Sequence, residues 1–293
     1  MHKYLRAIGF SQIKNKKQLN ELIDSVILEA DEKLYTSDKD DTLFAEYNKY
    51  IAYNVGISVR GEYDENDKFI YDYYFPFCKS EEISSFEDVS IERHAEKESY
   101  AGICDDIKIG VSLIFYLQNI ISYIKFKNAG KLPVGGTSLV LSGLSISGSI
   151  MMPIKKNETD KKKTKQALAN RNHLIAAARK GDEDAIESLT LEDMDTYTSI
   201  SRKILKEDIF TLVDTYFMPY GVECDHYSVL GEILEMESIK NAMTNEELYR
   251  LSVNCNEMIF DICINKQDLL GEPKVGRRFK GVIWLQGYIN FPE

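Results

Sequence analysis

The sequence predicts an α+β protein with two domains joined by a basic helical connector. Three observations support this class: a long and almost wholly apolar helical segment, an abrupt change of charge in mid-chain, and four strand-like segments near the end. The predicted N-terminal domain, residues 1–154, combines a sheet with the long buried helix, and the connector spans 155–181. The predicted C-terminal domain, 182–293, has two short helices followed by a small antiparallel sheet or a partly closed β-barrel.

An amphipathic helix is predicted over residues 18–30, because its apolar side chains recur at spacings of three and four. These side chains are Leu19, Leu22, Ile23, Val26 and Ile27. Residues 49–77 are rich in aromatic and β-branched residues on both sides of the turn sequence DEND. This pattern predicts a β-hairpin, and the helix is expected to cover the sheet that contains it.

The segment 104–130 has the start and stop signals of a helix of about six turns. Asp105 and Asp106 lie in its first turn, where negative charge is favourable, and Gly130 follows its last turn. Apolar residues cover nearly its whole circumference, so the helix is predicted to lie buried between layers. Its apolar run, 109–124, is too short to span a bilayer and contains polar residues, so no membrane contact is expected.

Residues 135–154 predict a strand pair or one long bent strand, with Gly143 and Gly148 at a turn or bulge and Pro153 at its end. The charge then changes sharply. Residues 155–180 carry nine lysines and arginines against two acidic residues, whereas the flanking parts are acidic. The connector begins like a linker, becomes helical at about Lys161 and stops at Gly181, which marks the predicted domain boundary.

Two short helices are expected to introduce the C-terminal domain, with Asp182 capping the first and Thr190 the second. Four strands are predicted beyond them, at 226–237, 247–256, 257–265 and 277–291. Asparagines at the junction of the middle two strands supply turn chemistry. The short spacing of the four strands favours a small antiparallel sheet or a partly closed barrel.

Composition limits the setting and the partners of the protein. The formal charge of −11 disfavours a protein that wraps nucleic acid along its length, because phosphate binding needs a positive field. The first residues contain no apolar signal-peptide core, and the five cysteines lack the density of a secreted disulfide framework. These features predict a cytoplasmic protein with reduced thiols, and no cofactor is expected.

Familiar chemical motifs fit poorly. The sequence around Gly130 and Lys131 has Leu132 where a phosphate-binding loop needs Ser or Thr. A zinc site would have to use residues whose spacing is unlike the usual tight pairs, so no metal is expected. These residues are Cys224, His226, Cys255 and Cys263. A catalytic pair of Cys104 with His94 is conceivable, but packing is the favoured role of a cysteine at the start of a buried helix.

The last predicted strand carries the strongest candidate for a binding surface. Strand alternation places an apolar face, with Phe279, Ile283 and Leu285, toward the core. The opposite face and the loop before it combine positive charge with the only tryptophan, a combination that can hold oxyanions and stack on rings. The candidate ligand-binding or partner-binding residues are Lys274, Arg277, Arg278, Lys280, Trp284 and Gln286. A solvated surface is the alternative interpretation.

Several blocks resemble a known bacterial family. They are YAGICDDIKIGVSLIFYLQN, LTLEDMDTYTSIS, DTYFMPYGVECDHYSVLGEI and CINKQDLLGEPKVGRRFKGVIWLQGYINF. The family is domain of unknown function 3881, from anaerobic Gram-positive bacteria, and the resemblance runs along nearly the whole chain. It implies a bacterial cytoplasmic setting and supplies no activity, ligand or catalytic residue.

Three functions are therefore weighed. The favoured hypothesis is a non-enzymatic binding or adaptor protein that recognises another protein or an anionic small ligand. The first alternative is a binder of RNA or single-stranded nucleic acid that uses the C-terminal β domain and the lysine-rich connector. The second is an enzyme with a site assembled between the domains.

Overall fold

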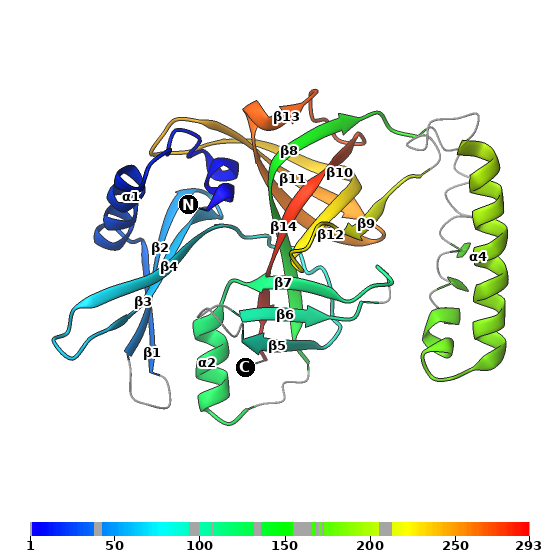
Figure 1. Ribbon diagram of the computed structural model, residues 1–293, viewed down its shortest axis with the longest axis horizontal. Coiled ribbons are helices and arrows are strands. Elements are labelled where there is room, and N and C mark those ends of the chain that lie inside the picture. Colours follow the sequence, from blue (N-terminus) through cyan, green and yellow to red (C-terminus); the bar gives the residue numbers. More distant parts are fainter. Residues whose placement is uncertain are drawn as a thin grey trace.

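Strands dominate the computed structural model of the protein and form two sheets (Figure 1). The structure describes residues 2–37, 43–93, 100–106, 108–131, 136–154, 166–167, 170–171, 173–204 and 213–292, with the backbone alone for 195–204. Both α and β elements are present, as the sequence predicts. Among the described residues, none of the helices combines the length and the apolar character that crossing a membrane requires.

The smaller sheet, which we call sheet A, is antiparallel and follows chain order. It consists of β1 (Glu32–Ser37), β2 (Leu43–Ala52), β3 (Val55–Tyr63) and β4 (Phe69–Cys78). The predicted hairpin is confirmed as β3 and β4, which pair across the turn that contains DEND. The predicted helix is confirmed as α1 (Lys16–Leu28), which buries Leu19, Leu22, Ile23 and Val26 and packs against β2 and β3.

The larger sheet closes on itself as a five-stranded barrel. Its strands are β8 (Ser138–Met151), β10 (His226–Lys240), β11 (Glu247–Cys255), β12 (Met258–Asn265) and β14 (Arg278–Asn290). They pair in the order β8, β12, β11, β10 and β14, and β14 pairs again with β8. The four C-terminal strands confirm the sequence prediction, and the segment before Pro153 is a single long strand.

Three features of the barrel could not be read from the local pattern. Strand β8, which precedes the connector, pairs parallel with β12 and antiparallel with β14. Strands on both sides of the connector therefore belong to one sheet. Short strands extend the barrel: β9 (Tyr216–Pro219) pairs with β10, and β13 (Leu269–Leu270), which follows the short helix η2 (Lys266–Asp268), pairs with β8.

The single long helix predicted over 104–130 is wrong. The segment forms the end of β6 (Tyr100–Cys104), strand β7 (Leu113–Leu117) and the short helix α2 (Ile120–Asn128). β7 pairs parallel with β14, and β6 and β5 (Val89–Arg93) continue the sheet beyond it. The apolar run wrongly indicates a helix because β7 lies between two cores. Both faces of the strand are therefore apolar, and this pattern resembles that of a fully buried helix.

One continuous helix, α4 (Glu183–Ile204), replaces the two short helices expected after the connector. Asp182 does cap it, because its carboxylate accepts a hydrogen bond from the backbone N–H of Ala185 at 3.1 Å. Thr190 instead donates its hydroxyl to the carbonyl oxygen of Ile186 at 2.8 Å, inside the helix. Residues 155–165 of the predicted connector lie outside the described residues.

Two cores hold the layers together. The first fills the barrel interior and reaches α2, and the second lies between sheet A, α1 and the outer face of the barrel. The short helix η1 (Lys3–Ile8) belongs to the second core and packs on β8, β12 and β4. In Figure 1, sheet A and α1 lie on one side of the barrel and α4 on the other. The junction between sheet A, α2 and the barrel is where a cavity forms.

Candidate functional site

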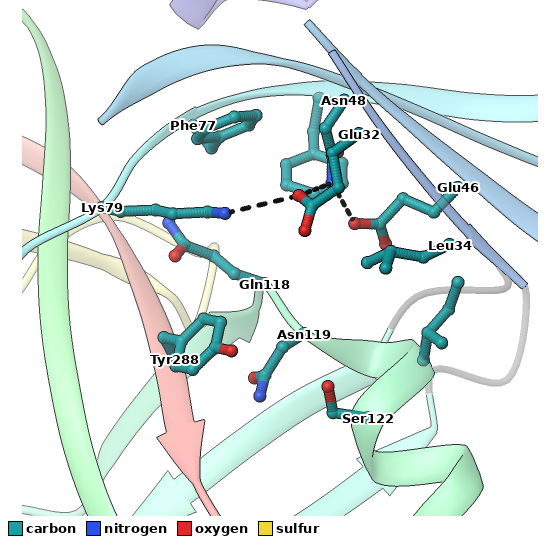
Figure 2. Close-up of a pocket in the computed structure, with 12 residues that line it drawn as sticks. Glu32, Leu34, Glu46, Asn48, Phe77, Lys79, Gln118, Asn119, Ser122 and Tyr288 are labelled. Carbon is teal, nitrogen blue, oxygen red and sulfur yellow. Dashed lines mark hydrogen bonds and ion pairs between the residues drawn. The ribbon is translucent and has the colours of Figure 1, made fainter. Parts of the chain in front are cut away.

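A polar cavity of about 50 Å³ lies at this junction, between sheet A, helix α2 and strand β14 (Figure 2). By the roughly 10–15 Å³ that one water molecule needs, it has room for a few water-sized groups. Residues of β1, β2, β4 and α2, and of the positions next to them, line it together with Tyr288 of β14. The lining side chains include no histidine and no cysteine.

Strand alternation delivers the polar side chains of sheet A to the cavity. Glu46 and Asn48 are two residues apart on β2 and therefore share a face. In the antiparallel register, Asn48 lies opposite Glu32 of β1, and Glu46 lies opposite Leu34. Glu46 and Asn48 are polar residues on the inward face of β2, and they are the one feature of the local sequence that indicates this site. The sequence predictions missed it.

A fully buried ion pair forms the back of the cavity. Arg60 of β3 has no exposed surface, and its Nε donates to Glu46 Oε2 at 2.5 Å. The guanidinium also donates to the Tyr73 hydroxyl at 3.1 Å and to the carbonyl oxygen of Gln118, and it lies 4.4 Å from the centre of the Phe75 ring. Removal of one partner from such a pair usually costs about 3–5 kcal/mol. The pair therefore fixes Glu46 in place.

The protonation states of Arg60 and of the neighbouring Tyr116 are strongly held. Burial alone lowers the pKa of the Arg60 guanidinium, but the attraction of Glu46 and the neighbouring tyrosine hydroxyls outweighs burial, so the pKa lies above its usual value. Burial raises the pKa of the Tyr116 hydroxyl well above its usual value. These groups keep one charge state at neutral pH, so they position other groups and do not exchange protons.

Asn48 lines the cavity and carries an acceptor that no described residue satisfies. Its Nδ2 donates to Glu46 Oε1 at 2.9 Å and to Glu32 Oε2 at 3.1 Å, and carboxylates only accept. The amide must therefore keep its nitrogen toward the carboxylates and its Oδ1 on the other side. Asn48 is only 3% exposed, and its Oδ1 has no hydrogen-bond partner. A buried acceptor left unpaired costs about 1–3 kcal/mol, which a bound donor would recover.

Lys79, which follows β4, and Glu32 of β1 line another part of the cavity. The Lys79 Nζ donates to the Tyr50 hydroxyl at 2.7 Å and lies 4.0 Å from the Glu32 carboxylate (Figure 2). The Lys79 side chain is 26% exposed and that of Glu32 is 40% exposed. Exposed ion pairs are weak, so Lys79 does little to hold Glu32. The Glu32 Oε2 also accepts from Asn48 Nδ2 at 3.1 Å and from the Tyr50 hydroxyl at 3.4 Å.

The opposite wall is held by amide side chains. Gln118 donates its Nε2 to the carbonyl oxygen of Cys78 at 2.8 Å and to Gln286 Oε1 at 2.9 Å. Asn119 donates to the carbonyl oxygen of Ile289 at 2.8 Å and accepts from its N–H at 3.1 Å. Ser122 and Tyr288 complete this wall (Figure 2). Within the described part of the chain, no hydrogen bond engages either hydroxyl.

The predicted binding face of the last strand is largely covered by the chain itself. Trp284 is 4% exposed, and its Nε1 donates to Asp225 Oδ2 at 2.7 Å. Tyr4 of η1 stacks on the indole with ring centres 5.4 Å apart, and the His2 ring lies 4.6 Å away. The opposite, apolar face is confirmed as core, with Phe279, Ile283 and Leu285 buried. The N-terminal segment covers the tryptophan.

The other predicted site residues are divided among several surroundings. Arg278 is buried and donates to the carbonyl oxygens of Met152 at 3.0 Å and Val213 at 2.8 Å. Gln286 is buried and donates to the carbonyl oxygen of Pro76 at 2.8 Å.

The loop residues interact with Glu272, and Lys280 stands apart from them. Lys274 pairs with the Glu272 carboxylate at 2.8 Å, and Arg277 donates to the Glu272 carbonyl oxygen at 2.7 Å. Lys280 is half-buried on β14. A binding role for the six residues stays a prediction, but Gln286 supports the cavity wall through Gln118, and Tyr288 lines the cavity.

Within the described residues, the Cys104 thiol donates to the Ser85 hydroxyl at 3.8 Å. Burial raises the pKa of the Cys104 thiol to about 11, which keeps it protonated, and His94 lies outside the described residues. Cys255 packs in the barrel core, Cys263 in the outer core, and Cys224 is exposed. Among the described residues, no three histidine, cysteine, aspartate or glutamate side chains gather as a metal site would require.

Comparison with known proteins identifies the family. No curated protein and no solved structure matches the chain. The family model described as "Domain of unknown function, E. rectale Gene description (DUF3881)" matches residues 5–287, which is nearly the whole chain. The protein therefore belongs to the DUF3881 family.

Proposed function

We propose that this protein binds a small polar ligand in the cavity between sheet A, α2 and the barrel, and that it recognises a protonated amino group of that ligand. The observation that carries the proposal is the buried Oδ1 of Asn48, which faces away from two carboxylates and has no donor. An ammonium group has three donors and no acceptor, so it complements Asn48 and the partly exposed carboxylate of Glu32.

The charge of the cavity also suits a single ammonium group. Glu46 is neutralised from behind by Arg60, whereas the counter-charge that the described residues give Glu32 is the partly exposed Lys79, 4.0 Å away. A ligand ammonium group would take the place of Lys79 beside Glu32. The small volume restricts the buried part of the ligand to a few heavy atoms.

Calorimetry with simple amines tests this proposal. Methylammonium and ethylammonium chloride are titrated at constant ionic strength, with tetramethylammonium chloride and potassium chloride as controls. Primary ammonium ions are expected to bind saturably, and tetramethylammonium, which has no N–H donor, is expected not to bind. An equal response to potassium would show that the cavity takes a metal cation and would overturn the proposal.

Variants locate the binding in the cavity. A hydrogen bond to a charged group contributes about 1.5–3 kcal/mol, so Asn48→Leu should weaken amine binding by roughly tenfold or more. Glu32→Gln keeps a side-chain oxygen that can accept from Asn48 Nδ2 and should weaken binding less. Asn20→Leu, the same change at an exposed position of α1, is the matched control and should have no effect. Amine binding that persists in both cavity variants would place the site elsewhere.

A further inference from the structure

An open groove adjoins the cavity on the side of α2 and the last strand. The two share the side chains of Asn119, Ser122 and Tyr288 as a common wall, and the groove encloses about 520 Å³. The cavity can hold only one end of any ligand larger than a few atoms. The rest of such a ligand would pass the common wall and lie in the groove.

The described lining of the groove carries positive charge within an acidic protein. Lys125 and Lys131 line it, and no aspartate or glutamate is among the lining residues that the structure describes. Within the described part of the chain, neither lysine forms an ion pair with a carboxylate. Lys125 lies in the last turn of α2, where it offsets the partial negative charge of the helix end, but Lys131 lies beyond the helix and adds to the positive field.

Two stacked aromatic rings line this groove. Phe126 and Phe291 stack with ring centres 5.1 Å apart and planes inclined by 23°. The Lys131 ammonium group lies 5.2 Å from the centre of the Phe126 ring. This contact holds a positive charge beside an aromatic surface of the groove.

We propose that the ligand is amphoteric: its protonated amine enters the cavity, and an oxyanion, carboxylate or phosphate, binds Lys125 and Lys131 in the groove. This inference rests on the proposed function, because the cavity must hold the amine. It assigns the anionic character of the ligand to the α2 groove and not to the β14 face, whose Trp284 and Arg278 are buried. The two charges lie on opposite sides of the wall formed by Asn119, Ser122 and Tyr288.

A spacer series measures the contribution of the oxyanion. Calorimetry compares each alkylammonium ion with the ω-amino carboxylate of the same chain length, from glycine to 6-aminohexanoate, and with O-phosphoethanolamine. Because one exposed ion pair contributes about 0.2–1 kcal/mol, two lysines should make the best spacer bind about two- to thirtyfold tighter than its alkylamine. Comparison of the ω-amino carboxylates with O-phosphoethanolamine shows whether the groove prefers a carboxylate or a phosphate.

Lysine variants assign this gain to the groove. Lys125→Gln and Lys131→Gln should each remove part of the gain and leave the affinity for the simple alkylamine unchanged. Lys127→Gln changes the same helix turn but does not line the groove, so it is the matched control. A gain that survives in the double variant of Lys125 and Lys131 would overturn the assignment.

The outcomes separate this inference from the proposed function. Saturable binding of alkylamines with no gain at any spacer length refutes the amphoteric ligand and leaves the amine site standing. No binding of either series refutes both. Added salt should reduce the gain from the oxyanion, because the lysines are exposed and their attraction is screened.

Discussion

At the scale of single residues, Asp261 is a partly buried acid on the outer side of β12. Burial raises its pKa to about 6, although the positive charge of Arg250 and the nearby Ser80 and Ser252 hydroxyls act in the opposite direction. Glu235 raises the pKa further. The folded protein therefore disfavours the ionised form of this carboxyl group at neutral pH.

Replacement of Asp261 by Asn should stabilise the protein above pH 6. The folded pKa lies above the unfolded value of about 3.8, so the folded state binds the proton more tightly and loses stability as the pH rises from about 4 to 6. Asp261→Asn removes this loss and should add about 1–3 kcal/mol at pH 8, with no difference below about pH 4. Urea denaturation of both proteins across this pH range measures the effect.

Asp64 provides a control of opposite sign. Hydrogen bonds from the backbone N–H groups of Lys68 and Asn66, each at 2.9 Å, lower its pKa. Its stabilising contribution is present above the unfolded pKa and is lost as the pH falls, so Asp64→Asn should not stabilise at pH 8. If both variants gained stability equally, relief of the general negative charge would explain the result, and the burial of Asp261 would not.

At the scale of elements, two glycines allow strands β6, β7 and β14 to pack around one phenylalanine. A Cβ atom at Gly102 would lie 2.1 Å from the Phe115 ring, and one at Gly287 would lie 2.4 Å from it. Gly102 is paired with Phe115 across β6 and β7, and Gly287 lies on β14 beside β7. The ring therefore covers both glycines, and their missing side chains are a packing requirement.

Gly287→Ala should destabilise the protein through a clash with the Phe115 ring. Overpacking of a tight core usually costs about 1–3 kcal/mol, and urea denaturation should detect the loss. Phe115→Leu in the same chain should restore part of it, because the smaller side chain leaves room for the methyl group. Gly148→Ala meets Phe279 instead, so its effect should simply add to that of Phe115→Leu. Equal coupling of both glycines to Phe115 would contradict this packing.

The elements also show which features the sequence could predict. The four C-terminal strands were predictable because residues such as Leu251 and Val253 alternate with polar neighbours that face away from the barrel core. β7 was not, because Phe115 faces one core while Tyr116 faces the other, and no polar face remains to mark a strand.

The candidate site was harder to predict for the same physical reason. Glu46 and Asn48 form a local signal, but Gln118 and Tyr288 reach the cavity only through the pairing of distant strands. Likewise, the polar face around Trp284 was recognisable, but its cover is Tyr4, at the other end of the chain. Periodicity reports which face a residue occupies and not what packs against it.

At the scale of the whole molecule, closure of the barrel depends on a strand from the first half of the chain. β8 hydrogen-bonds with both β12 and β14, so a fragment that begins after the connector has two unpaired edges where the barrel should close. Trp284 adds a second dependence, because η1 covers it on the outer face of the same barrel.

The full chain should therefore unfold as one cooperative unit. Urea curves from Trp284 fluorescence and from far-ultraviolet circular dichroism should coincide, because the indole sits where η1 meets the barrel. The fragment 182–293, which is the predicted C-terminal domain, should lack a cooperative transition and show the red-shifted emission of a solvated indole. A fragment that includes β8, residues 136–293, should recover barrel structure in part but leave Trp284 exposed. A cooperative transition with blue-shifted emission in the fragment 182–293 alone would instead establish an independent C-terminal domain, with β8 as an accessory strand.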